Sequence, residues 1–331
     1  KITDVFVSKL DPSGDFIWAR SMGSNQVDGA FAVNIDSGNN VLLTGCFQDT
    51  SDFDPGVGVY NLIASAYYDM FVTKLNALGD FIWAKRISSS VGKAITTDPV
   101  GNVYTTGYFS NTGDFDPGLS TYTLIATSTD AFVSKLDAAG NFVWVKQING
   151  NWDENGLSIA LDVSGNIYTT GYFQKYTDFD PGVSSYTLSA FGTYGSQDIY
   201  ISKHDQSGNF IWAKQMGGDK IDIGNCIVVD GLDNIYTTGY FTDLADLDPN
   251  SGTFNVTSFG SADVFLHKIS NGNFVSVSEI NLSNNFKIYP TPTTSIINIV
   301  DENNQLQNAT IEIKNYLGQI VFISPFTTQI N

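Results

Sequence analysis

The sequence is short of cysteine and histidine, and both shortages exclude classes of protein. Cys46 and Cys226 are the only cysteines among 331 residues, too few for a disulfide framework. They fall in non-adjacent repeats, so we expect no bond between them, and Cys226 is predicted to be a small buried residue because Ala or Ser fills its slot elsewhere. With two His and no Gly-x-Ser-x-Gly elbow, zinc and nucleophilic catalysis lack their parts.

Basic residues are also scarce. The chain has 16 Lys and Arg against 34 Asp and Glu, and the net charge of −18 opposes binding to nucleic acid or to anionic lipid. No run approaches the roughly 20 apolar residues that a membrane span needs. Only four of the 34 acids are Glu, which leaves 30 Asp, the acid that favours turns over helix interiors. The composition therefore favours an all-β protein.

A motif that reads Asp-x-Phe/Tyr-Val/Ile-x-Lys recurs along the chain, with Leu in the fourth place of its last copy. Its copies are separated by 65, 61, 68 and 65 residues and begin at Asp4, Asp69, Asp130, Asp198 and Asp263. The first four copies run through a Gly-centred turn into an aromatic strand that contains Trp18, Trp83, Trp144 or Trp212. A second hairpin ends three times in Tyr-Thr-Thr-Gly-Tyr-Phe, at residues 104–109, 168–173 and 236–241. Each period therefore predicts two hairpins.

Two hairpins give four strands, and four-stranded sheets repeated radially are the blades of a β-propeller. An open solenoid is the alternative, although its coils are usually shorter than about 60 residues. The chain begins just before an outer hairpin, so the first blade is expected to be incomplete. The Trp series, at one fixed slot per repeat, is predicted to pack between blades.

The combined pattern D-x-F-V-x-K-L-D-x-x-G-x-F-x-W and D-x-x-G-N-x-Y-x-T-G-Y-F resembles the bacterial β-propeller repeat (SBBP) family of secreted and surface proteins. The resemblance covers residues 1 to about 278 and is specific because the pattern recurs. It implies blades of about 65 residues, each with four strands.

Residues 279–285 are predicted to be a linker, and 286–331 a small β-sandwich-like domain. This tail resembles the type A C-terminal sorting domain that directs Bacteroidetes proteins through the type IX secretion system. The matching positions are Tyr289, Pro290, Pro292, Thr293, Leu317, Gly318, Gln319 and Val321. Thr291 replaces the usual Asn, and the chain stops at Asn331 before the family's last strands, so the resemblance covers a partial domain. An Ig-like stalk is the alternative.

An acidic linker follows each inner hairpin of the four later repeats. It reads Asp-Phe-Asp-Pro-Gly at residues 52–56, 114–118 and 178–182, and Asp-Leu-Asp-Pro-Asn at 246–250. In an extended segment both carboxylates share one face while the apolar residue points into the core. Calcium is therefore a possible cofactor, with Asp49 and Asp243 as third acids beside two of the pairs. The candidate ligands are Asp49, Asp52, Asp54, Asp114, Asp116, Asp243, Asp246 and Asp248.

Two observations limit this hypothesis. Lys175 lies in the corresponding third place beside the Asp178/Asp180 pair and would neutralise it, so that linker is predicted to bind calcium less well. The alternative is that the second Asp caps a Pro-Gly turn and the first is solvated.

The resemblances imply an exported protein, outside the cell or on its surface, with the type IX secretion machinery as a partner. We expect a non-catalytic binding or adhesion module whose ligand is an extracellular glycan or protein. The alternatives are a polysaccharide hydrolase or lyase, and a structural filament or sheath subunit. Trp152, which lies outside the repeat pattern, is the candidate exposed contact residue.

Overall fold

The structure is a computed structural model in which the backbone of residues 3–180, 184–193, 195–270, 286–289, 298–301, 310–314 and 320–325 is described, with side chains described as far as residue 270. The chain forms two compact units, residues 1–271 and 272–331. All described elements are strands. The described part of the chain contains no helix long and apolar enough to cross a bilayer.

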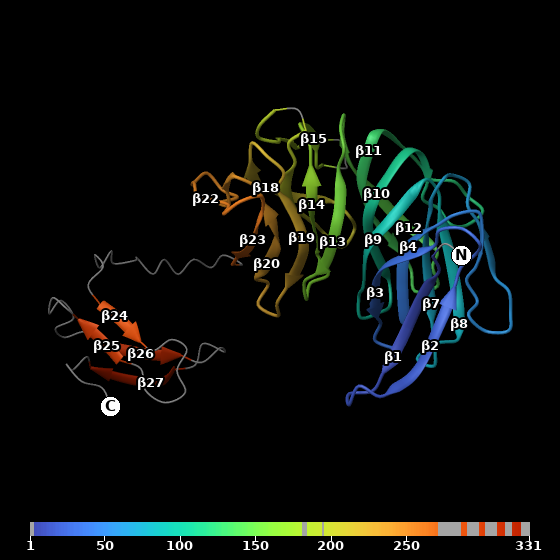
Figure 1. Cartoon of the computed structure of the whole chain (residues 1–331), viewed down its shortest axis with the longest axis horizontal. Coiled ribbons are helices and arrows are strands. Elements are labelled where there is room, and N and C mark those ends of the chain that lie inside the picture. Colours follow the sequence, from blue (N-terminus) through green and yellow to red (C-terminus); the bar gives the residue numbers. More distant parts are fainter. Residues whose placement is uncertain are drawn as a thin grey trace. The chain divides into compact units, whose positions relative to one another are not determined.

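The first unit is an all-β propeller, as the repeat predicts, and has four blades (Figure 1). A hairpin that belongs to an incomplete blade comes first, with β1 (Val5–Leu10) and β2 (Phe16–Met22). The first blade contains β3 (Gly29–Ile35), β4 (Val41–Phe47), β7 (Asp69–Leu75) and β8 (Phe81–Ile87). The second contains β9 (Ser90–Thr97), β10 (Val103–Asp114), β11 (Thr123–Leu136) and β12 (Phe142–Gly150).

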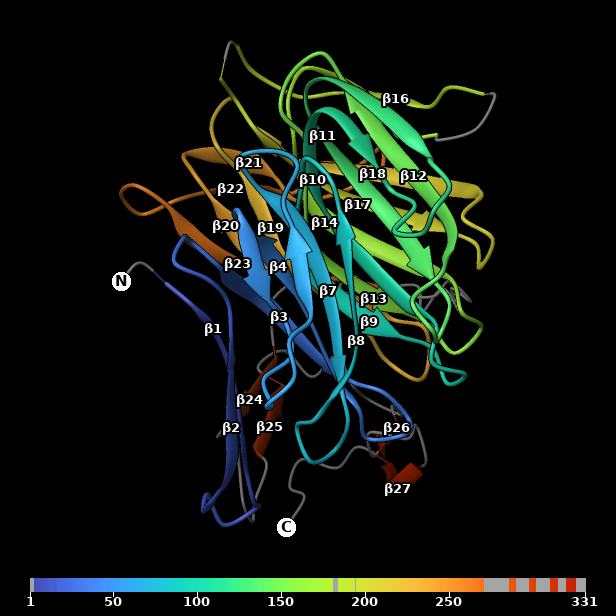
Figure 2. The same ribbon diagram turned by 90° about the vertical axis from the view of Figure 1, so that its right-hand side faces the viewer.

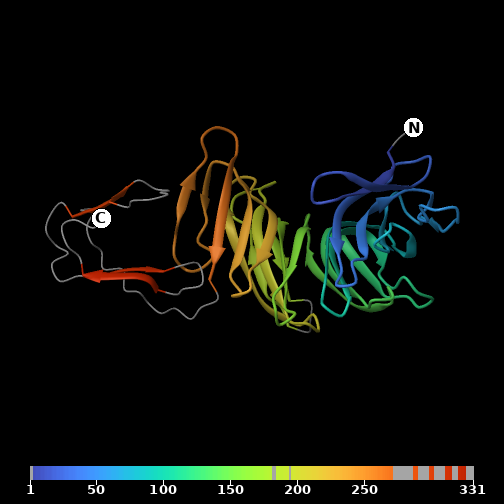
Figure 3. The ribbon, with the colours of Figure 1, turned by 90° about the horizontal axis from the view of Figure 1, so that it is seen from below.

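The third blade contains β13 (Asn155–Leu161), β14 (Ile167–Phe173), β17 (Asp198–His204) and β18 (Phe210–Gly218). The fourth contains β19 (Ile223–Val229), β20 (Ile235–Phe241) and β23 (Asp263–Ile269). All pairings within blades are antiparallel, and successive blades lie beside one another in chain order (Figure 3).

Short hairpins in the acidic linkers connect one blade to the previous one. They are β5 (Thr50–Asp52) with β6 (Asn61–Ile63), β15 (Tyr176–Asp178) with β16 (Thr187–Ser189), and β21 (Leu244–Asp246) with β22 (Asn255–Thr257). In the third and fourth blades the linker hairpin pairs with the preceding blade, so that β15 and its partner β16, which is labelled in Figure 2, extend the sheet beyond β12, and β21 extends the sheet beyond β18. The linkers therefore join blades through backbone hydrogen bonds, a feature that the repeat pattern alone did not predict.

Asp side chains stabilise most of the described hairpin turns, and Asn76 does so in the outer hairpin of the first blade. Asp11 Oδ1, for example, accepts the backbone N–H groups of Ser13 and Asp15 at 2.8 and 2.9 Å. Gly14 of the same turn has φ +88°, a region that favours Gly because a Cβ would be strained there. The same contacts recur at Asp36, Asp98, Asp137, Asp162, Asp205 and Asp230. This repeated use explains the excess of Asp over Glu.

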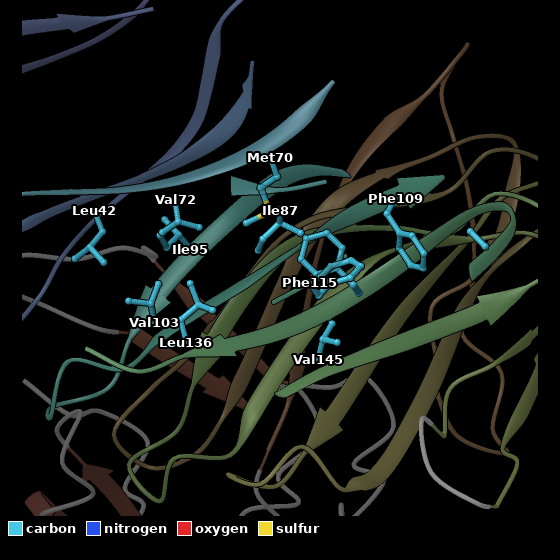
Figure 4. Packing of buried hydrophobic residues seen from close by; sticks show 12 residues of the cluster. Leu42, Met70, Val72, Ile87, Ile95, Val103, Phe109, Phe115, Leu136 and Val145 are labelled. Carbon is cyan, nitrogen blue, oxygen red and sulfur yellow. The ribbon is translucent and has the colours of Figure 1, made fainter. Parts of the chain in front are cut away.

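The core lies between blades. In one cluster, Met70 and Ile87 of the first blade pack with Phe109 and Phe115 of the second (Figure 4). Phe115 and its linker equivalents Phe53 and Phe179 are fully buried, which confirms that this residue points into the core. The Trp series lies at the same interfaces, as predicted. Trp18 Nε1 and Trp83 Nε1 each donate to a carbonyl of the following blade, at Ala77 and Ala138 respectively, over 3.3 Å.

The prediction for Cys226 is wrong. Cys226 is exposed and Cys46 is buried, and neither forms a disulfide, as expected. Cys226 lies on the fourth blade's β19, where Val228 on the same face is also 53% exposed. No described blade covers that face, whereas the equivalent positions Ala94 and Ser158 have a following blade beside them.

The second unit contains two described hairpins. They pair β24 (Phe286–Tyr289) with β25 (Asn298–Asp301), and β26 (Thr310–Lys314) with β27 (Ile320–Pro325). Tyr289 and Val321 lie on strands β24 and β27. The other sorting-motif positions, Pro290, Pro292, Thr293, Leu317, Gly318 and Gln319, lie outside the described residues, as does the predicted linker 279–285.

Candidate functional site

The first Asp of each linker motif caps its own turn. Asp52 Oδ1 accepts the backbone N–H groups of Asp54 and Tyr60, at 3.0 and 2.8 Å. Asp114, Asp178 and Asp246 make the same two contacts with the residues two and eight positions later. An Asp is needed here because its short carboxylate reaches two amides of the loop at once.

The second Asp of the motif caps the Pro-Gly turn. Asp54 Oδ1 accepts the N–H of Gly56 at 2.8 Å, and Asp116 and Asp248 make the equivalent contacts with Gly118 and Asn250. These are the hydrogen bonds that the turn-capping alternative expects of the second Asp, but its expectation that the first Asp is solvated is wrong, because that residue accepts two backbone N–H groups. In residues 3–180, 184–193 and 195–270, no three His, Cys, Asp or Glu side chains are grouped so as to hold one metal ion. Calcium binding at the linkers remains a prediction.

The upstream position, predicted to supply a third acid, has a backbone role. Asp49, Asn111, Lys175 and Asp243 all adopt positive φ, between 54° and 64°. Asn and Asp adopt this left-handed conformation more readily than most other residues. The carbonyl of Asp49 accepts the N–H of Ala64 at 2.7 Å, and Lys175 and Asp243 make equivalent contacts. The residue type at this position is therefore explained by a tight turn.

Two equivalent grooves lie at the outer edge of the propeller. The groove between the first and second blades has a volume of about 180 Å³ and is lined by Tyr60, Lys85, Asp114 and Asp116. The groove between the third and fourth blades has a volume of about 240 Å³ and is lined by Tyr186, Lys214, Asp246 and Asp248. Each therefore combines a Tyr and a Lys of one blade with two acids of the next.

The tyrosines of these grooves are held by stacking on the adjacent blade strand. Tyr60 stacks on Phe81 with ring centroids 4.8 Å apart, and Tyr186 stacks on Phe210 at 5.0 Å. Tyr60 is 40% exposed and Tyr186 41% exposed, so one side of each ring remains open. In the second groove Lys214 Nζ donates to Asn250 Oδ1 at 2.7 Å. The grooves thus present fixed aromatic faces beside charged groups.

A second set of acids lies deeper in the blade junctions and was missed by sequence reasoning. Asp198 begins β17 of the third blade, and Asp222 immediately precedes β19 of the fourth. A backbone bridge brings them together, because the N–H of Asp222 donates to the carbonyl of Gln197 at 2.8 Å. Both carboxyls are fully buried. The burial raises the pKa of Asp198 to about 8 and that of Asp222 to about 6, and the nearby Asp222 and Asp219 further raise the pKa of Asp198.

The junction between the second and third blades has the same arrangement. Glu154 N–H donates to the carbonyl of Thr129 at 2.7 Å, which places Glu154 beside Asp130. Burial raises the pKa of Glu154 to about 9 and that of Asp130 to about 6. The junction before the first blade carries the pair Asp4 and Asp28.

The junction between the first and second blades is different. Ser90 occupies the slot of the second acid, and Arg86 occupies the slot filled by Gln147 and Gln215 in the next two blades. Arg86 forms a salt bridge of 2.8 Å with the buried Asp69. The sequence could have indicated these acids through two repeat positions that vary together, because Arg86 is present in the repeat where Ser90 replaces the second acid.

Two further residues lie outside these sets, and a contact role for Trp152 stays a prediction. Trp152 is half-buried, so only part of its ring is open to solvent. His204 is fully buried, and the burial lowers its pKa to about 4.

Comparison with known proteins agrees with this architecture. A family model described as "Beta-propeller repeat" (SBBP) matches residues 211–240, which supports the predicted repeat in that segment. The chain is also similar to the "Uncharacterized WD repeat-containing protein L264" of Acanthamoeba polyphaga mimivirus, with 25% identity over 248 residues. The aligned part covers 65% of this chain and 17% of the viral protein.

Proposed function

We propose that this chain is a non-catalytic binding module that recognises an extracellular glycan through the outer grooves between its blades. The observation that carries the proposal is the recurrence of one groove composition at two junctions. Each groove offers the open face of a Tyr, a Lys and two carboxylates. An aromatic face packs against the C–H face of a sugar ring, while carboxylates and ammonium groups hydrogen-bond to its hydroxyls.

The rigidity of the scaffold supports this proposal. Tyr60 and Tyr186 are held against Phe81 and Phe210, so little side-chain freedom is lost on binding. A polymer long enough to contact both grooves would gain affinity from the second contact, because that contact is intramolecular. Weak single grooves could therefore serve adhesion.

The test is binding of the full chain to a panel of immobilised neutral polysaccharides, followed by a double Tyr60→Ala and Tyr186→Ala variant. If each ring contributes about 1.4 kcal/mol, its removal weakens one groove tenfold. Tyr176→Ala is the matched control, because Tyr176 is 68% exposed and does not line either groove. Equal binding by all three proteins, or binding to protein ligands only, would refute glycan recognition by these grooves.

Export through the type IX route is a separate part of the proposal and rests on the resemblance of the tail to a sorting domain. Tyr289 and the Leu317-Gly318-Gln319 segment carry that resemblance. Deletion of everything after Asn284 should keep the propeller inside the cell of a host with this secretion system. Unchanged secretion of the shortened chain would remove this part of the proposal.

A polysaccharide hydrolase is the second candidate, and the raised pKa values of Asp198 and Asp222 are the observation in its favour. A general acid needs such a raised pKa, but it must also reach its substrate. Both side chains are fully buried, and similar pairs recur at other junctions. Release of reducing sugars that is lost in Asp198→Asn would nevertheless favour the hydrolase.

A structural filament subunit is the third candidate. Val264 and Leu266 on β23 are 79% and 77% exposed, and an assembly of copies could cover them. Sedimentation of the purified chain without ligand distinguishes this function, because a filament subunit would assemble as its concentration increases.

A further inference from the structure

The junction between the third and fourth blades holds two acids around one glycine. Asp198 Oδ1 and Asp222 Oδ2 lie 2.9 and 3.0 Å from the position that a Cβ on Gly217 would take. Gly217 has φ +148°. It lies at the end of β18 that pairs with the linker strand β21. The two carboxylates therefore converge on a space that exists because this residue has no side chain.

One oxygen in this space lacks a hydrogen-bond partner. Asp198 Oδ2 accepts from the N–H of Phe191 and from Gln215 Nε2, at 2.9 and 2.8 Å, whereas Asp198 Oδ1 has no partner. Asp222 accepts the N–H groups of Gly218 and Thr242. A buried carboxylate oxygen without a donor is costly, and the unpartnered Asp198 Oδ1 is the oxygen that shares the space beside Gly217 with Asp222 Oδ2.

The other junctions have hydrogen bonds or charges to their acids that this junction lacks, although Asp130 Oδ1 and Glu154 Oε2 between the second and third blades also have no partner. The buried Asp28 accepts the hydroxyl of Ser51 at 2.7 Å, and Glu154 accepts the hydroxyl of Thr177 at 2.8 Å. The equivalent linker position here is Ala245, which has no hydroxyl to donate. Between the first and second blades, the positive charge of Arg86 is supplied within the chain. The junction between the third and fourth blades thus has two buried acids but neither a linker hydroxyl nor an Arg beside them.

A cavity of about 590 Å³ adjoins the acid pair. Its wall includes Gly217, whose Cβ position lies about 3 Å from both carboxylates, together with Asp219, Lys220, Asp243 and Asp246, whereas the buried Asp198 and Asp222 do not line it. Its three carboxyls outnumber the one ammonium group of Lys220, and a negative wall in a chain of net charge −18 attracts cations.

We propose that Asp198 and Asp222 bind one calcium ion between the third and fourth blades, and that this ion holds the two blades together. The two carboxylates would supply the anionic ligands. Calcium accepts six to eight oxygen ligands in flexible geometry, so backbone carbonyls and water would complete the shell. The two proposed ligands are not linker acids, although the linker acids Asp243 and Asp246 line the adjoining cavity and Asp246 also lines a proposed glycan groove.

The experiment measures calcium binding to the chelator-stripped full chain by isothermal titration calorimetry, together with unfolding in chelator and in excess calcium. Binding to this site predicts that calcium at a hundredfold excess over its Kd raises the ratio of folded to unfolded protein about a hundredfold. Magnesium should bind more weakly because it requires near-ideal octahedral geometry and gives up water reluctantly.

The matched variant carries Gln215→Arg and Asp222→Ser. These substitutions reproduce Arg86 and Ser90, the residues at the equivalent positions between the first and second blades. It should fold in chelator and bind one calcium fewer than the parent. If that double variant does not fold, Gln215→Arg alone places a guanidinium beside Asp198 and should also remove one ion. The linker variant Asp52→Asn should keep the ion. A parent chain that binds no calcium at millimolar concentration, or junction variants with unchanged stoichiometry, would overturn the proposal.

Discussion

Glu154 allows the electrostatic reasoning about the blade junctions to be tested through one side chain. Its carboxyl is fully buried, and Oε2 has no hydrogen-bond partner. Burial above all, with the neighbouring Asp130 and Asp153, raises its pKa to about 9. An unfolded Glu has a pKa of about 4.3, so at intermediate pH this group is protonated in the folded chain and ionised in the unfolded chain. Folding therefore takes up one proton.

The sign of the effect follows from that proton. Because the folded state binds more protons, the contribution of Glu154 to stability is greatest below the unfolded pKa and falls as pH rises towards the folded pKa of about 9. The slope is about 1.4 kcal/mol per pH unit for one proton. Glu154→Gln keeps the shape and can still accept the hydroxyl of Thr177, but it takes up no proton. Between pH 5 and 8 the variant should gain about 4 kcal/mol relative to the parent.

Urea denaturation of both proteins from pH 5 to 8, in chelator, measures this difference. Asp15→Asn is the control, because it removes one carboxyl from an exposed turn and should follow the parent at every pH. Parallel stability curves for the parent and Glu154→Gln would refute the reasoning, since Glu154 would then have the same protonation in both states. A variant that loses stability relative to the parent as pH rises would refute it as well.

Three further predictions concern packing, charge and the linkers. Ile201→Ala should cost about 2–5 kcal/mol in urea unfolding and Leu266→Ala less than about 0.5 kcal/mol, because these equivalent slots are 0% and 77% exposed. Arg86→Met should cost about 3 kcal/mol in the same assay, since it leaves the buried Asp69 without its cation. Asp52→Ala should cost about 2 kcal/mol with or without calcium, because two amides lose their acceptor. A loss seen only in calcium would instead support a metal site at the linker.

The blade architecture could be predicted from the sequence because the repeat copies the same local signals several times. Each Gly turn and each alternating strand is local information, and recurrence of the pattern removes the ambiguity of one copy. The burial of Phe53, Phe115 and Phe179 followed from the same alternation. The pairing of the linker hairpins with the preceding blade did not, because strands of three residues such as β15 and β21 are too short to give a periodic pattern.

The junction acids were missed for a different reason. The second acid is Asp28, Glu154 or Asp222 in three junctions and Ser90 in the other, so no constant motif marks the slot. Its importance depends on a neighbour from the previous repeat, which only the packing of two blades reveals. The prediction for Cys226 was wrong for a similar reason. It assumed that residues at the same position of the repeat have the same surroundings, but Cys226 is exposed.

The junctions show how one structural problem is solved in several ways within one chain. A carboxyl at the start of β7 or β17, or within β11, is buried against the next blade, and burial of an isolated charge is unfavourable. Asp69 is paired with Arg86, whereas burial raises the pKa of Asp130 and Asp198 so that a proton can neutralise them. A cation could replace that proton only where two acids converge, because one carboxylate offers too few ligands. At a junction with a second acid, a proton or a calcium ion would therefore take the place of the fixed positive charge of Arg86. The stability of the contact between those blades would then depend on pH and on calcium.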